Sequence, residues 1–136
     1  GVDVSEEAIK KANEIFKGGL FKVNSSDDIM MSDRSTDVVL SDASLIYVAP
    51  KDIRRYVREI KRITRNRILL CEFHSTSWWN RLALRLNTGY FAYDWKRLLE
   101  KEGMYDIKMF KLREEDWPGF PWDKFGWLIL ATVPKR

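Results

Sequence analysis

Three side chains that could accept or donate a proton stand just beyond apolar stretches of the sequence. Asp42 and Tyr47 follow the run DVVLS at residues 37–41, and His74, the only histidine, follows RILLCEF at residues 67–73. Carboxylate, phenol and imidazole groups are common general acids and bases. If both runs are parallel strands, their carboxyl ends meet at one edge of a sheet. The pattern makes the three residues candidate catalytic groups. The alternative is structural: a hydrogen-bonded histidine at a strand end, and a tyrosine that covers the helix behind it.

Another acid stands at the start of the chain. Asp3 lies between Val2 and Val4, which form the end of a short strand, and a helix follows at once. In open α/β sheets, ligands bind where the chain leaves the carboxyl end of a strand. Asp3 is therefore a candidate binding residue. It could instead interact only with the N-terminus of the helix that follows.

The elements that must position these residues alternate between helix and strand. The first helix is predicted from apolar residues at three- and four-residue steps, with Ser5 as its N-cap and Gly18-Gly19 at its end. Residues 20–23 form a short strand candidate, and residues 24–36 a polar loop. The apolar runs at 37–41 and 67–73 are typical of strands covered on both faces. Between them, residues 50–66 carry an apolar stripe of helical period, which predicts a parallel strand, helix, strand unit.

The second half of the chain predicts a different ending. After a long aromatic segment, Asp94 can cap a helix that Gly103 ends, and the runs DIKMFKL at 106–112 and GWLILATV at 126–133 are strand candidates. No helix is expected between these last two strands, so they should pair antiparallel. The predicted fold class is therefore α/β: one domain over residues 1–136, with a mainly parallel sheet flanked by helices and ending in an antiparallel strand pair.

Composition limits the location and the chemistry. The chain has 136 residues, 45% of them hydrophobic, but no apolar run near the length of a membrane-spanning helix. Cys71 is the only cysteine, so neither a disulfide framework nor a cysteine metal site is expected, and no metal is assigned. Cys71 should be a buried thiol. These features favour a soluble protein of a reducing compartment, the cytoplasm.

In this order the segments resemble the class I, Rossmann-like S-adenosylmethionine-dependent methyltransferases. GVDVSEEAIKKA resembles the second strand and following helix of the family, DVVLSDASLIYV the fourth strand and its turn, and IKRITRNRILLCEF the next helix and the fifth strand. EKEGMYDIKMFKL and GWLILATV resemble the last helix and the sixth and seventh strands. The resemblance implies S-adenosylmethionine as cofactor and methyl transfer to a small-molecule acceptor.

The family's first strand and its glycine-rich turn have no counterpart in this sequence, which contains no GxG pair. We therefore expect a domain that is incomplete at its N-terminus, a sheet that closes differently, or a second chain that supplies the strand. The isolated chain should bind the cofactor weakly or not at all. A catalytically inactive scaffold is one alternative function.

The resemblance also implies roles for individual residues. It assigns Asp3, with Val4 beside it, to the ribose hydroxyls of the cofactor, and Ser41 to its methionine end. Ser25 and Ser26 stand where the family places an acid against adenine, although the neighbouring Asp27 and Asp28 leave that register open. Simple turn chemistry is the alternative for this polar loop.

Aromatic residues between Trp78 and Trp95 stand where the family builds lids over its substrates. Trp78, Trp79 and Tyr93 are therefore candidate substrate-binding residues, with core packing as the alternative. The exposed strand edges that a missing strand would leave, together with these aromatic side chains, predict self-association to a dimer.

A further alternative function comes from charge. Eight Lys or Arg and two acids lie between Lys51 and Arg67, in a chain of formal net charge +4. This is compatible with a nucleic-acid-binding module, but a solvated helix face is favoured because the basic residues lie opposite the apolar stripe.

Overall fold

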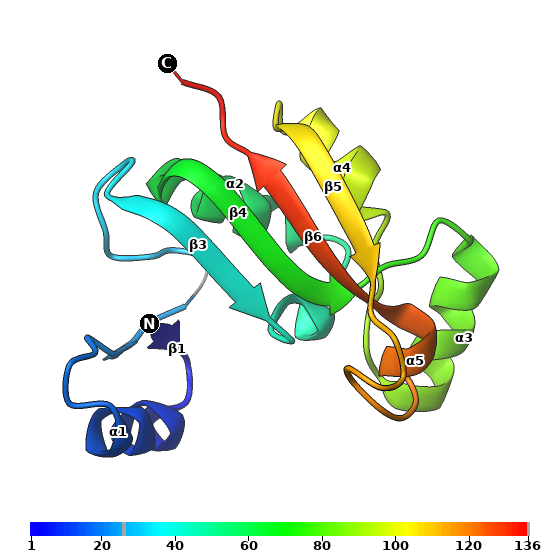
Figure 1. Ribbon diagram of the computed structural model, residues 1–136, viewed down its shortest axis with the longest axis horizontal. Coiled ribbons are helices and arrows are strands. Elements are labelled where there is room, and N and C mark those ends of the chain that lie inside the picture. Colours follow the sequence, from blue (N-terminus) through cyan, green and yellow to red (C-terminus); the bar gives the residue numbers. More distant parts are fainter. Residues whose placement is uncertain (26, 136) are drawn as a thin grey trace.

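The chain folds into two separate sheets with helices packed against them (Figure 1). The structure is a computed structural model that describes residues 1–25 and 27–135. In the smaller sheet, two short strands joined by helix α1 (Glu6–Ile15) pair in parallel, namely β1 (Val2–Asp3) and β2 (Lys22–Val23). The larger sheet has the order β3-β4-β6-β5, formed by β3 (Thr36–Asp42), β4 (Thr64–Phe73), β5 (Tyr105–Lys111) and β6 (Gly126–Thr132). The predicted α/β class is confirmed.

The predicted strand, helix, strand unit is present. Strands β3 and β4 lie side by side and parallel, with Leu40 opposite Leu69, and helix α2 (Ile53–Ile63) connects them. Ile53, Val57 and Ile60 of this helix are buried, as the apolar stripe predicts. At the first helix, the Ser5 hydroxyl accepts a hydrogen bond from the Ala8 amide at 3.2 Å, so the predicted cap is also confirmed.

The last two strands pair antiparallel, as predicted, but their surroundings differ from the expectation. Strand β6 lies between β4 and β5 and is antiparallel to both. The segment before it was expected to contain no helix, and this is wrong, because α5 (Trp122–Phe125) forms one helical turn there. Four residues make only about one turn of helix, too short to carry the chain across the sheet to a parallel neighbour, so β6 runs back alongside β5.

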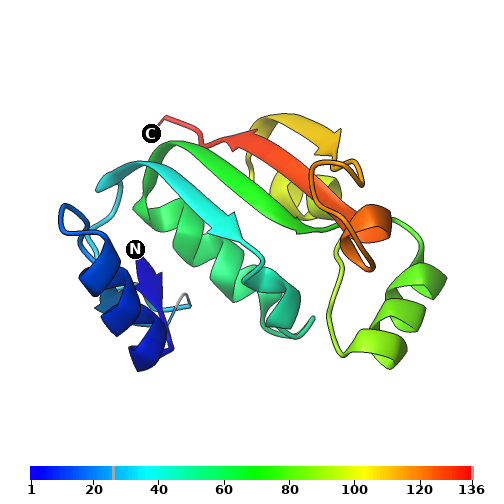
Figure 2. The same cartoon turned by 60° about the horizontal axis from the view of Figure 1, so that its bottom comes forward.

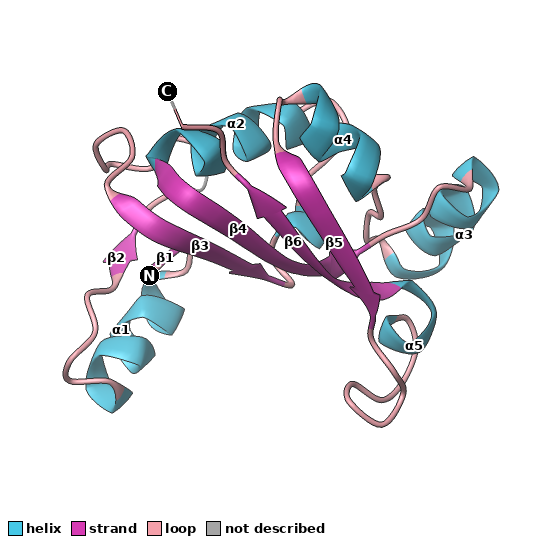
Figure 3. Cartoon of the chain, turned by 45° about the horizontal axis from the view of Figure 1, so that its top comes forward, coloured by secondary structure: helices cyan, strands magenta, loops and turns pink. Residues whose placement is uncertain are grey.

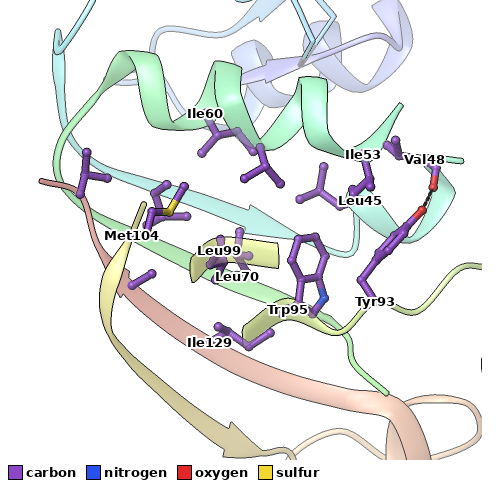
Figure 4. Packing of buried hydrophobic residues seen from close by; sticks show 14 residues of the cluster. Leu45, Val48, Ile53, Ile60, Leu70, Tyr93, Trp95, Leu99, Met104 and Ile129 are labelled. Atoms are coloured by element: carbon purple, nitrogen blue, oxygen red, sulfur yellow. Dashed lines mark hydrogen bonds between the residues drawn. The ribbon is translucent and has the colours of Figure 1, made fainter. Parts of the chain in front are cut away.

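The main core lies between one face of the four-stranded sheet and two helices, α2 and α4 (Trp95–Lys101) (Figure 2). Figure 4 shows Trp95 and Leu99 of α4 meeting Leu70 and Ile129 of the sheet. The Trp95 side chain is fully buried, and its Nε1 donates a hydrogen bond of 2.9 Å to the Phe73 carbonyl oxygen. Burial of large apolar side chains of this kind is the dominant stabilising contribution to a domain.

The opposite face of this sheet carries exposed apolar side chains. Val38 is 51% exposed and Leu40 62% exposed, and Phe110 at the other side of the sheet is also exposed. Among residues 1–25 and 27–135, no strand joins β1 to β3. The alternative in which the sheet closes by direct pairing of these two strands is therefore wrong for the described part of the chain.

Two further elements surround the carboxyl ends of β3 and β4 (Figure 3). The 3₁₀ turn η1 (Leu45–Tyr47) follows β3, and helix α3 (Trp78–Thr88) follows β4. Ser77 caps α3, and Gly89, with φ at 80°, ends it in the left-handed conformation that glycine adopts without strain. No helix in the described ranges is both long and apolar enough to span a bilayer.

Candidate functional site

A cavity of about 720 Å³ lies between the β1 unit and the end of β3. Its lining comes from β1, from the turn after β3 and from α2, and five of the predicted site residues belong to it: Asp3, Val4, Ser41, Asp42 and Tyr47. The volume is in the range of sites that hold small organic ligands. Asp3 and Val4 therefore share one site with Ser41, Asp42 and Tyr47, at the carboxyl ends of two strands that are far apart in the sequence.

Asp3 is anchored through one of its two carboxylate oxygens. The Ser5 amide donates to its Oδ1 at 2.8 Å, and the backbone of Asp3 accepts a hydrogen bond of 2.9 Å from the Asn24 amide. Among the described residues, no donor is bonded to the second oxygen, Oδ2. Asp3 can thus interact with the N-terminus of α1 through Oδ1 and still bind a ligand through Oδ2.

Asn24 is a lining residue that the sequence did not single out. Its Oδ1 is buried and has no hydrogen-bond partner among the described residues. A buried acceptor without a donor is costly, so such atoms are usually satisfied by a ligand, a water or an ion. Asn24 follows β2 directly, and its position next to Asp3 gives the cavity a second polar group that can hydrogen-bond to a ligand.

The turn after β3 is held by a buried carboxylate, Glu72 of β4. Its Oε1 accepts hydrogen bonds from the Ser41 hydroxyl at 2.7 Å and from the Ser44 and Leu45 amides at 3.1 Å each, and its Oε2 accepts one from the Ile46 amide at 3.1 Å. Glu72 is fully buried. Burial raises the pKa of Glu72, and the four hydrogen bonds oppose that shift. The carboxylate thereby fixes the backbone that presents Asp42 to the cavity.

Asp42 and Tyr47 lie on the exposed side of that turn. Asp42 pairs across the sheet with Cys71, and both burial and this neighbouring carboxylate raise the pKa of the Cys71 thiol to about 12. The thiol is thus buried and protonated, as expected from the sequence. The Tyr47 ring meets the Tyr90 ring edge-on at a centroid distance of 5.4 Å. The pKa of Tyr47 is raised, first by partial desolvation and then by the neighbouring Tyr90, so its phenol stays protonated at neutral pH and can donate a hydrogen bond.

His74 is held away from this cavity. Its Nδ1 accepts a hydrogen bond of 3.2 Å from the Trp95 amide, and its ring packs edge-on against Trp127 at 5.3 Å. Burial lowers the pKa of His74, so the imidazole is neutral at neutral pH. It is not among the cavity-lining residues. The surroundings of His74 are therefore those of the structural alternative, a hydrogen-bonded histidine at a strand end.

Ser25 and the predicted substrate residues Trp78, Trp79 and Tyr93 do not line this cavity. The Ser25 hydroxyl donates to Asp27, and Ser26 lies outside the described residues. The Trp78 and Trp79 rings stack on the exposed surface of α3, with their centroids 3.5 Å apart. Tyr93 is buried in the main core, where its hydroxyl donates to the Val48 carbonyl oxygen (Figure 4).

The cavity combines polar and apolar lining. Asp3, next to Val4 in the chain, and Asn24 offer hydrogen-bond acceptors on one wall, and Val48 adds an apolar side chain after the turn. Asp42 and Tyr47 add a hydrogen-bond acceptor and a hydrogen-bond donor on the wall formed by the end of β3 and the turn after it. In the described ranges, no group of three or more His, Cys, Asp or Glu side chains is arranged to hold a metal ion.

Comparison with known proteins gives a consistent result. Residues 1–70 match the family described as "Methyltransferase domain". No curated protein matches the sequence. The fold is similar to that of a SAM-dependent methyltransferase of Methanosarcina mazei, with 18% identity and a TM-score of 0.72, over 100% of this chain and 82% of that one.

Two further solved structures share the fold. One is a putative methyltransferase of Haloferax volcanii in complex with a methyltransferase activator, with 16% identity and a TM-score of 0.74, over 99% of this chain and 71% of that one. The other is magnesium protoporphyrin IX methyltransferase of Synechocystis with bound SAH, with 14% identity and a TM-score of 0.66, over 98% of this chain and 63% of that one.

Proposed function

Because the chain belongs to the methyltransferase domain family, whose cofactor is S-adenosylmethionine, we propose that it transfers a methyl group to a small-molecule acceptor at the cavity between β1 and β3. The observation that carries this proposal is that Asp3, Ser41 and Asp42, which the family resemblance singles out, line one cavity together with Tyr47. Asp3 belongs to β1, Ser41 and Asp42 end β3, and Tyr47 belongs to η1, so the fold brings three elements together at this cavity.

The residues of the cavity have distinct roles in this proposal. Asp3 accepts hydrogen bonds from the ribose hydroxyls through its Oδ2, because its Oδ1 is already bonded to the Ser5 amide. Asn24 accepts a further hydrogen bond through its buried Oδ1. When bound, S-adenosylmethionine supplies an electrophilic methyl group. Ser41 lines the cavity at the end of β3 and is held there by Glu72.

The acceptor is aligned and deprotonated by the turn after β3. Methyl transfer is an in-line displacement, so positioning and exclusion of water are the main tasks of the protein. Asp42 is the group that can take a proton from the acceptor, since its carboxylate lines the cavity while the His74 imidazole does not. Tyr47, which lines the cavity from the turn, donates a hydrogen bond to the acceptor.

The charge of α2 also supports a small-molecule acceptor over nucleic acid. Arg54 and Arg58 both bond to Glu102, and Arg62 bonds to Glu59 and Asp33. These cations are engaged in ion pairs within the chain, and nucleic acid phosphates would have to compete for them.

The experiment is a binding measurement with S-adenosylmethionine by saturation-transfer NMR, which detects weak complexes. We expect weak binding, because the sequence has no GxG turn that would bring backbone amides to the ligand. Asp3→Asn should abolish most of the signal, since it removes the charged acceptor. Glu14→Gln removes an equivalent charge from the exposed side of α1, outside the cavity, and should leave the signal unchanged. Equal binding by the parent chain and the Asp3 variant would contradict the proposal.

A further inference from the structure

A second pocket, of about 680 Å³, lies between α2, α3 and α4. Its lining includes five basic side chains and one acid: Arg54, Arg81, Arg85, Arg97 and Lys101, with Asp94. The pocket is separate from the cavity at β1, and no residue lines both. Like charges gathered around a concave surface raise the local concentration of counter-ions, so this pocket attracts anions.

Most of these cations have no carboxylate partner. Arg54 is bonded to Glu102, with Nε and Oε1 2.8 Å apart. For the other four, no ion pair with a carboxylate occurs within residues 1–25 and 27–135. Asp94 uses its Oδ1 to cap α4 through the Arg97 amide. The pocket therefore carries an excess positive charge that the chain itself does not neutralise.

The basic residues stand on rigid elements. Arg81 and Arg85 are one turn apart on α3, so their side chains lie on the same side of that helix. Arg97 and Lys101 are likewise one turn apart on α4. The Arg85 guanidinium also lies over the Phe91 ring, 4.4 Å from its centroid. Two pairs of cations on two helices thus flank one pocket.

The remaining wall is apolar and aromatic. Ile53 of α2, Leu82 of α3, Leu98 of α4 and the rings of Phe91 and Tyr93 line the pocket beside the cations. Tyr93 cannot turn away, because its hydroxyl is bonded to the Val48 carbonyl oxygen. An inorganic ion would use only the charged wall. A ligand with both an anionic group and a planar apolar body would use both walls.

We propose that the pocket between α2, α3 and α4 binds a small organic anion of this type, a phosphate ester of an aromatic compound. Arg81 and Arg97 bond the phosphate, since guanidinium groups match phosphate oxygens in pairs. Phe91 and Tyr93 contact the ring. The site goes beyond the methyl-transfer function and does not depend on it, because it shares no lining residue with the cavity at β1.

The test is isothermal titration calorimetry of the full chain with phenyl phosphate at fixed ionic strength. Phenyl phosphate should bind roughly tenfold more tightly than inorganic phosphate, which lacks the apolar body. Arg81→Gln and Arg97→Gln should each weaken phenyl phosphate binding by roughly tenfold, the usual effect of losing a hydrogen bond to a charged group. Thermal unfolding of each variant, followed by circular dichroism, reports whether its fold is intact.

The matched control is Arg67→Gln. Arg67 is an exposed arginine at the opposite end of β4 and does not line the pocket. This variant has the same net charge as the other two and should bind phenyl phosphate like the parent chain. Three results would overturn the proposal: no binding to the parent chain, an equal loss in Arg67→Gln, or equal affinity for inorganic phosphate. Binding of a short DNA duplex that weakens steeply with salt and responds equally to Arg81→Gln would replace it with a nucleic acid surface.

Discussion

At the scale of single residues, Glu72 is the side chain on which the turn of the candidate site depends. It accepts four hydrogen bonds from one short stretch of chain, Ser41 to Ile46, and three of the donors are backbone amides. Glu72→Leu replaces the carboxylate with an apolar side chain of similar size and leaves these buried amides without an acceptor. We expect a loss of about 3 kcal/mol or more in the free energy of unfolding, measured by urea denaturation.

Glu72→Gln provides the comparison. The amide oxygen still accepts hydrogen bonds, so this variant should be more stable than Glu72→Leu and less stable than the parent chain. Glu100→Gln, on the exposed side of α4, should change the unfolding free energy by less than about 0.5 kcal/mol. If the leucine variant proved as stable as the glutamine variant, the buried carboxylate would not be holding the turn.

The sequence predicted part of the candidate site at this scale. Asp3, Asp42 and Tyr47 were predicted because each follows or ends a strand, and such positions meet at one edge of a sheet; Ser41 was predicted from the family resemblance. Glu72 was missed because it lies within the run RILLCEF, where an apolar strand was the main signal. An acid in such a run is itself a signal, since a buried carboxylate needs several donors.

At the scale of elements, the loop before β3 is attached to α2 by two charged side chains. Arg62 donates to the Ile29 and Met31 carbonyl oxygens at 2.8 Å each, and Glu59 accepts a hydrogen bond of 2.7 Å from the Ile29 amide. The Arg62 guanidinium, which donates two hydrogen bonds to Glu59, holds the pKa of that carboxyl below its ordinary value of 4.5. The attachment is therefore sensitive to acid.

The sign of this effect follows from the lowered pKa. A carboxyl group with a lower pKa in the folded state stabilises the fold fully above its unfolded pKa, and this contribution is lost as the pH falls through the folded value. The parent chain should thus lose stability below about pH 4.5. Glu59→Gln, which does not titrate, should be less stable by about 1 kcal/mol at neutral pH and should lose less on acidification.

Urea unfolding of the parent chain and of Glu59→Gln is measured at about pH 7 and about pH 3. Other carboxyls titrate in both chains, so the difference between the two pH effects reports Glu59 alone. Glu100→Gln is again the control and should show the pH dependence of the parent chain. Parallel pH profiles for the parent chain and Glu59→Gln would mean that the ion pair contributes nothing to stability.

Local patterns predicted most elements but not their order in the sheet. The apolar runs predict strands β3 and β4, and the apolar stripe predicts helix α2, because the spacing of apolar residues reflects which side of an element is buried. The insertion of β6 between β4 and β5 depends instead on pairing between residues far apart in the chain, which no local period encodes. The one-turn helix α5 is too short to produce a periodic signal.

At the scale of the whole molecule, the large sheet is covered by α2 and α4 on one face only (Figure 2). The uncovered face carries rows of apolar side chains, in which Leu40 stands opposite Leu69 and Leu69 opposite Leu130. Exposed apolar side chains gathered on one face, here Val38, Leu40 and Phe110, are typical of an interface. We expect this chain to self-associate to a dimer, measured as a doubling of mass by light scattering over a concentration series.

Two matched substitutions distinguish the surfaces that could meet. Leu40→Lys places a charge on the uncovered sheet face, and Leu86→Lys places the same charge on the exposed surface of α3 near Trp78 and Trp79. The first variant should shift the mass toward that of one chain, and the second should not. A parent chain that stays monomeric at high concentration would rule out association, and dissociation by Leu86→Lys alone would move the interface to α3.

The two outer strands of the large sheet differ in a way that limits how such copies could add to one another. Strand β5 has an irregular register between Tyr105 and Lys108, with Asp106 at a φ of 49°, and it carries Lys108 and Lys111 along its length. Irregular backbone and lysines are the devices by which natural proteins block edge-to-edge growth. Strand β3, by contrast, pairs with β4 in continuous register from Val38 to Asp42, so its outer edge presents a regular row of backbone groups. Growth into a filament needs two complementary surfaces on each subunit. A molecule with only one edge open to strand pairing uses that edge up when it pairs with a second copy, so assembly stops at two chains.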